Sequence, residues 1–159
     1  MFHKLRSLLL LLIVLTGQTT VLASVRFSFP DSGKFALPAK SGPPLFKQCS
    51  RSAPERIVEF WQPSTDEINE LERLLIGNLA AREKRGTALP PNGSYHRQYI
   101  GFTKNKVRFI YGNYYPSNLP FNSKKNEPLI MCDGGPLFWG IVFRVDTKQF
   151  DEPTFNGSI

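Results

Sequence analysis

The stretch that decides the fold is PSTDEINELERLLIGNLAAREKRG, residues 63–86. Ser64 stands at an N-cap position and Glu67 follows three residues later, which is the pattern of a capping box. Apolar side chains then recur at helical spacing on one stripe: Ile68, Leu71, Leu74, Leu75 and Leu79. Gly86 is typical of a helix end. We therefore predict a helix from about residue 65 to 84, whose apolar stripe covers a second layer.

Runs rich in β-branched and aromatic residues follow this helix and predict that second layer. The runs are residues 95–103, 107–115, 129–132, 138–145 and 149–155. Short polar turns at 104–106 and 146–148 predict two hairpins. One long helix followed by four or five antiparallel strands predicts an α+β fold, with the helix on one face of the sheet. The element order is analogous to a cystatin-like fold, or as a second choice to an NTF2-like one.

The beginning of the chain has the pattern of a secretory signal peptide. Lys4 and Arg6 precede the apolar run 8–15, and small residues ending at Ala23 form a cleavage site. The apolar run is too short to span a membrane, which takes roughly 20 residues. We expect residues 1–23 to be removed and the remainder to be periplasmic or secreted, with no membrane span.

The mature chain is expected to hold one domain. Residues 24–54 are rich in Pro, Ser and Gly and predict an extended lead-in, with a short strand near 25–29, and residues 55–159 predict a single α+β domain. Without Lys4 and Arg6, 18 basic residues face 13 acidic ones. This small, dispersed excess does not indicate nucleic-acid binding.

Two cysteines, Cys49 and Cys132, lie in the mature chain. An even number of cysteines in an exported protein favours a disulfide. The alternative is a pair of buried free thiols.

Few residues are candidates for catalysis. His96 is the single histidine of the mature chain, so a zinc site or a nucleophile-base pair lacks partners, and we predict no metal. Glycine loops that cradle phosphates are also missing, so no cofactor is predicted. Asp133 precedes Gly134-Gly135-Pro136, a turn at which a carboxylate can approach a ligand. The alternative is that Asp133 only caps the turn.

Tyr95, Arg97 and Tyr99 alternate along one strand and therefore share a face of the sheet. An exposed face of Tyr and Arg is typical of protein recognition. The alternative is that these side chains pack under the helix.

Three segments resemble a group of small exported proteins of Gram-negative bacteria. They are FWQPS at 60–64, RQYIG at 97–101 and CDGGPLFWG at 132–140, and the group also ends in a segment similar to 155–157. The resemblance covers about residues 55–157. It implies a periplasmic setting and implies no activity.

These observations lead to two hypotheses for function. The first is an exported binding or inhibitor-type module that contacts a protein, peptide or glycan through Asp133 or through Tyr95, Arg97 and Tyr99. The second is a small hydrolase of envelope polymers that uses Asp133 as acid or base with help from His96. A structural role in an envelope assembly is a third possibility that the sequence does not separate from the first.

Overall fold

The computed structural model describes residues 27–119 and 127–158. The expected signal peptide, residues 1–23, lies outside this part of the chain. Within the described ranges, no helix is long and apolar enough to cross a membrane.

The long helix forms as predicted and is α2 (Thr65–Arg85). The Ser64 hydroxyl accepts a hydrogen bond from the Glu67 backbone N–H, and the Glu67 carboxylate accepts one from the Ser64 N–H at 2.9 Å. Gly86 ends the helix with φ +67°, a conformation that glycine adopts without a steric penalty. The predicted apolar stripe is the buried side of the helix.

Eight strands form one open sheet. They are β1 (Phe27–Ser28), β2 (Lys34–Ala36), β3 (Glu59–Trp61), β4 (Gly93–Lys104), β5 (Val107–Pro116), β6 (Trp139–Arg144), β7 (Gln149–Phe150) and β8 (Thr154–Phe155). The shorter helical segments are η1 (Asp31–Gly33), η2 (Ala39–Ser41), α1 (Gly42–Leu45) and η3 (Gly135–Leu137). The central ladder is β4–β5–β6.

The α+β class is confirmed, but the prediction of a purely antiparallel sheet of four or five strands is wrong. β1 and β2 run parallel to β4, whereas the remaining pairs are antiparallel. The mixed pattern arises because residues 27–36, expected to be an extended lead-in, lie along the edge of β4 that β5 leaves free. The lead-in is thus folded onto the sheet.

The predicted hairpins are present, with differences in detail. β4 and β5 pair from Tyr95↔Pro116 to Lys104↔Val107. Residues 149–155 form two strands, β7 and β8, because Pro153 has no N–H to donate to a ladder.

Residues 129–132, predicted to be a strand, are not one. Their segment crosses the sheet, and side-chain amides meet its backbone. The Leu129 N–H donates to Gln98 Oε1 at 2.8 Å, and the Leu129 carbonyl accepts from Asn113 Nδ2 at 3.0 Å.

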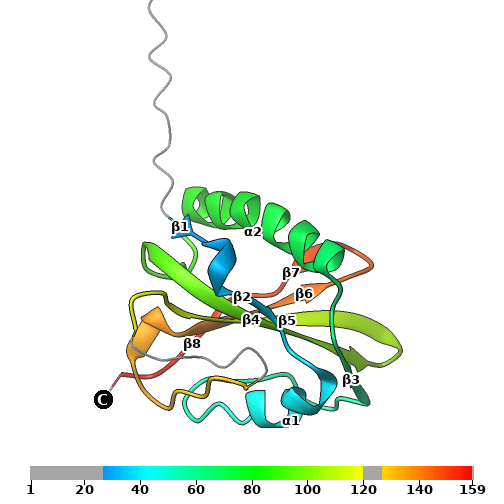
Figure 1. The fold of residues 1–159 in the computed structure, drawn as a ribbon. Helices are drawn as coiled ribbons and strands as arrows, with labels where there is room; N and C mark the ends of the chain where they lie inside the picture. The colour runs from blue at the N-terminus through cyan, green and yellow to red at the C-terminus, as the bar shows by residue number, and fades with distance from the viewer. Residues whose placement is uncertain (1–26, 120–126, 159) are drawn as a thin grey trace, which may run out of the picture.

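The sheet is covered on both faces (Figure 1). α2 packs on one face, which we call the helix face, while α1 and the chain around it lie against the opposite face, the second face. The helix-face core includes Leu71, Leu75 and Trp139, and the second-face core includes Leu37, Leu45 and Tyr111. Each core is fully buried, so the sheet has no face that is wholly open to solvent.

The predicted disulfide between Cys49 and Cys132 is confirmed, with Cα atoms 4.6 Å apart. It joins the end of the lead-in to the segment that crosses the second face.

Candidate functional site

The three hairpin residues proposed as a recognition surface are buried. Tyr95, Arg97 and Tyr99 do share one face of β4, but that face lies under α2, and their exposed fractions are 1%, 0% and 0%. The prediction of an exposed Tyr and Arg surface is therefore wrong, and the alternative of packing under the helix is correct. Sequence periodicity placed the residues on one face without showing which face was covered.

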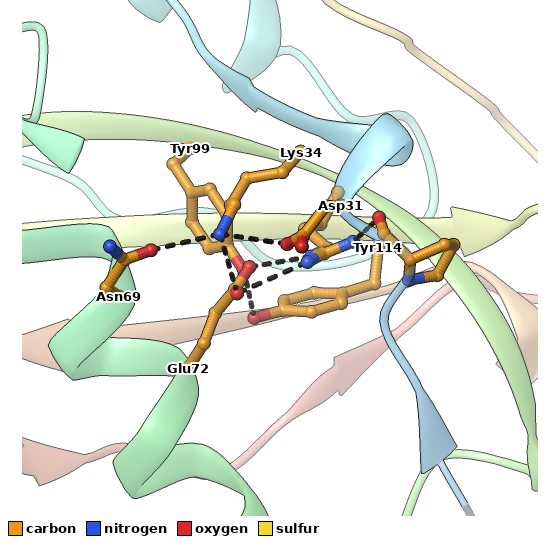
Figure 2. Close-up of polar contacts among 8 residues, drawn as sticks. Asp31, Lys34, Asn69, Glu72, Tyr99 and Tyr114 are labelled. Atoms are coloured by element: carbon orange, nitrogen blue, oxygen red, sulfur yellow. Dashed lines mark hydrogen bonds and ion pairs between the residues drawn. The ribbon is translucent and has the colours of Figure 1, made fainter.

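Tyr99 and Lys34 approach the carboxylate of Glu72 on α2 (Figure 2), and Arg97 bonds to the same carboxylate. Arg97 donates from Nε to Glu72 Oε1 at 2.6 Å and from Nη2 to Oε2 at 3.2 Å, and the Tyr99 hydroxyl donates to Oε1 at 2.8 Å. The ammonium of Lys34 lies 3.4 Å from Oε2 of the same carboxylate, and it also donates a hydrogen bond to Asn69 Oδ1 at 2.9 Å. The remaining arm of Arg97 donates to the Pro30 carbonyl. This cluster, which we call the Glu72 cluster, ties the lead-in, β4 and α2 together.

The pKa directions in the Glu72 cluster show that its charges are compensated. Burial alone would lower the pKa of Arg97, but the hydrogen bonds and charge of Glu72 raise it overall. Burial raises the pKa of Tyr99 well above its usual value, and the neighbouring Tyr114 and Glu72 add to the rise. Tyr99 therefore stays a neutral donor to the carboxylate. Because each guanidinium nitrogen of Arg97 has a hydrogen-bond partner, we interpret the Glu72 cluster as a structural network that stabilises the fold.

Asp133 lies on the exposed turn predicted for it. Gly134 and Gly135 both have positive φ, and the Asp133 carbonyl accepts a hydrogen bond from Asn156 Nδ2 at 3.2 Å. His96 lies elsewhere, on the second face, with its ring edge-on to Phe35 and Tyr115. No contact among the described residues joins Asp133 to His96. Within the described part of the chain, no group of three or more His, Cys, Asp or Glu side chains is arranged to hold a metal ion.

A hollow of about 690 Å³ opens on the second face. Its floor is apolar and comes from the central strands: Phe102, Phe109, Tyr111 and Val142. Residues 52–54 form part of its wall just after the disulfide-linked Cys49. Polar side chains surround the opening: Lys104, Arg144, Asp151 and Glu152. We call this the second-face hollow.

The strand register builds the floor. Phe102 pairs with Phe109 across the β4–β5 ladder, and their rings stack with centroids 5.2 Å apart and planes 14° apart. Tyr111 pairs with Val142 of β6. Gly140 of β6 gives the Tyr111 hydroxyl its room, since a Cβ there would collide with it. The floor is therefore built on β4, β5 and β6, the central strands of the sheet.

Two of the four charged side chains at the opening form ion pairs. Arg144 pairs with Asp146 at 2.8 Å, and Glu152 pairs with Arg82. Lys104 forms no ion pair within the described residues.

Arg51, next to the wall, has an unusual environment. It is 7% exposed, and its Nη2 donates to Asn113 Oδ1. Its Nε and Nη1 are buried with no hydrogen-bond partner, and the same holds for the hydroxyl of Tyr111. Burial lowers the pKa of Arg51, although Tyr111 acts in the opposite direction. No described carboxylate forms an ion pair with it.

Comparisons with protein-family models, curated proteins and solved structures find no match for this chain.

Neither the second-face hollow nor the burial of Arg51 was predicted from the sequence. One signal was present: Phe102, Phe109 and Tyr111 alternate with the helix-face residues, so they had to line the opposite side of the sheet. Residues 24–54 were interpreted as an irregular lead-in because prolines interrupt any periodicity. For this reason nothing in the sequence indicated that residues 52–54 form a wall of the second-face hollow.

Proposed function

We propose that this protein is an exported binding module and that its ligand lies in the second-face hollow. The observation that carries the proposal is a cavity of about 690 Å³ with an apolar floor and a polar rim. Ligand sites are commonly concave, mostly apolar and roughly 300–1,000 Å³ in volume, with a few polar groups to orient the ligand. The second-face hollow has each of these properties.

The setting outside the cytoplasm is supported by the Cys49–Cys132 disulfide, because such bonds persist in oxidising compartments. The signal-peptide pattern and the resemblance to exported Gram-negative proteins point the same way. A periplasmic or secreted location is therefore part of the proposal. The cystatin-like and NTF2-like analogies concern element order, and the proposal does not depend on them.

The hollow accommodates a short segment rather than a large partner surface. Stacked Phe102 and Phe109 offer a flat apolar platform, and Val142 extends it. Such a floor suits an apolar side chain of a peptide or the apolar face of a sugar ring. Asp133 and His96 are not among the residues that line the hollow, and no observation favours the hydrolase hypothesis over binding.

The test is to fill the hollow. Val142→Trp adds bulk to the floor, and Ile76→Trp adds the same side chain to the outer surface of α2, where Ile76 is 44% exposed. N-acetylated tripeptides and chito-oligosaccharides serve as probes, followed by methyl NMR of the mature chain.

We expect a probe to shift the Val142 methyl signals of the wild-type protein. Binding should be lost in Val142→Trp and unchanged in Ile76→Trp. Shifts confined to residues outside the hollow, or equal binding by both variants, would contradict the proposal.

A further inference from the structure

Arg51 is a buried cation without an anion. Guanidinium groups stay protonated in proteins, so burial cannot be relieved by loss of the proton. A buried charge is costly unless it is paired and hydrogen-bonded. Arg51 has one hydrogen bond, to a neutral amide, and its Nε and Nη1 nitrogens have no hydrogen-bond partner. Its surroundings are therefore complementary to a negative group that the described residues do not supply.

The position of Arg51 relates it to the second-face hollow. Its chain neighbour Ser52 lines the wall, and its guanidinium carbon lies 5.9 Å from the ring centroid of Tyr111, which lines the floor. Its bonded partner Asn113 is paired in register with Gly140, which also lines the hollow. These three relations place Arg51 next to the lining of the hollow.

The hydroxyl of Tyr111, which interacts electrostatically with Arg51, is the second polar group at this place. Tyr111 is 1% exposed, and its hydroxyl has no hydrogen-bond partner although the residue lines the hollow. Burial raises the pKa of this hydroxyl overall, although the nearby Arg51 acts in the opposite direction, so the hydroxyl keeps its proton and can donate. Two kinds of unused donor therefore lie together, and a carboxylate, which only accepts hydrogen bonds, matches both.

We propose that the second-face hollow binds a peptide through its free C-terminal carboxylate, with Arg51 and Tyr111 as the carboxylate donors. This inference rests on the proposed function. Arg51 is 7% exposed and lies behind the lining rather than in it, so we take the ligand's carboxylate from a chain end, the narrowest part of a peptide. The apolar floor formed by Phe102, Phe109 and Val142 then receives an apolar side chain of the peptide.

The wall is able to admit the carboxylate. Residues 52–54 belong to neither helix nor strand, and their backbone makes no backbone hydrogen bond within the described part of the chain. Segments with few backbone hydrogen bonds open at low cost. Binding of the carboxylate therefore requires a small shift of this wall, which would expose the donors of Arg51 to the hollow.

The experiment compares acids with their neutral analogues. N-acetyl-Ala-Phe-Ala with a free C-terminal carboxylate and the same tripeptide as its C-terminal amide are titrated into the mature protein by calorimetry. A galacturonate disaccharide and its methyl ester form a second pair of probes. The variants are Arg51→Gln, Arg51→Lys and, as a control, Arg73→Gln on the exposed side of α2.

We expect the peptide acid to bind at least tenfold more tightly than the amide, about the worth of one charge-assisted hydrogen bond. Arg51→Gln should abolish this preference, Arg51→Lys should keep part of it, and Arg73→Gln should keep all of it. If Arg51→Gln does not fold, loss of the preference in Tyr111→Phe provides the same test.

The possible failures are distinguishable. Equal binding of acid and amide, with Val142 methyl shifts, overturns the carboxylate inference and leaves the proposed function intact. Tighter binding of the uronate than of the peptide acid overturns the choice of a peptide. No binding by any probe, with no Val142 shifts, overturns both proposals.

Discussion

Arg97 and Arg51 are both buried beside a tyrosine, one on each face of the same sheet, and they differ in their hydrogen-bond partners. Arg97 is 0% exposed and meets the Glu72 carboxylate with two donors. Arg51 is 7% exposed and meets a neutral amide with one. Accordingly the pKa of Arg97 is raised and that of Arg51 is lowered, although burial acts downward on both.

The difference separates a structural role from a binding role. On the helix face Arg97, Tyr99 and Glu72 bond to one another or to the backbone, so the Glu72 cluster itself does not call for a ligand. On the second face the orphaned donors of Arg51 and Tyr111 lie beside a hollow. A buried group that the protein leaves unsatisfied calls for an explanation, and a ligand supplies one.

The largest effect is expected from the disulfide, which holds the second face while α2 needs no covalent link. Replacing Cys49 and Cys132 by serine removes a crosslink over a sequence separation of 83 residues. We expect the free energy of unfolding to fall by about 4.5 kcal/mol in the chain-entropy model.

Urea unfolding measures this loss, and hydrogen exchange shows where the structure loosens. Residues 45–57 and 127–132 should lose protection before α2 does. Equal loss of protection on both faces would contradict the distinction between them.

The next effect is on the Glu72 cluster. Glu72→Gln leaves Arg97 buried without an anion, and breaking a buried ion pair in this way costs about 3 kcal/mol. Glu70→Gln on the same helix is the matched control, because Glu70 and its partner Lys148 are 37% and 43% exposed. Exposed pairs contribute about 0–1 kcal/mol, so this control should barely change the urea midpoint.

Sequence patterns predicted the parts of the fold that depend on local chemistry. The capping box at Ser64, the apolar stripe of α2 and the β4–β5 hairpin follow from spacing and turn residues within a short window. The parallel pairing of β2 with β4 does not, because it depends on a free edge created more than fifty residues later.

The same limit explains the outcome for the candidate site. Alternation along β4 grouped Tyr95, Arg97 and Tyr99 correctly, but only tertiary packing decides that α2 covers them. The hollow depends on Ser52, which lies in a proline-rich segment without periodicity and takes its position from the disulfide and the lead-in.

A smaller effect should appear in the pH dependence of stability, through His96 on the second face. Burial lowers its pKa, and the positive charge of Arg97 lowers it further. The unfolded chain therefore takes up this proton first as the pH falls through about 6.5. The contribution of His96 is favourable above that pH, declines below it and levels off under the folded-state pKa.

Urea unfolding at pH 7.5 and pH 5.5 tests this. The wild-type protein should lose stability between the two values, His96→Gln should lose less, and Arg73→Gln should match the wild type. If His96→Gln loses as much stability between pH 7.5 and pH 5.5 as the wild type, then other titrating groups cause the pH dependence.

The smallest effect is expected from Arg51→Met, and its contrast with Arg97→Met tests the comparison most directly. Arg97→Met breaks the ion pair with Glu72 and should cost about 3 kcal/mol. Arg51→Met removes a cation whose burial is uncompensated, which is favourable, and leaves Asn113 Oδ1 without its donor, which costs about 1–3 kcal/mol. These two terms oppose each other, so the net change in the free energy of unfolding should stay within about 1 kcal/mol. Because the substitution is the same, its side-chain entropy and apolar volume are matched, and the two urea midpoints report the presence or absence of a carboxylate partner. If Arg51→Met proves as destabilising as Arg97→Met, then the buried charge of Arg51 is already compensated within the protein. The environment of Arg51 would then give no reason to expect an anionic ligand on the second face.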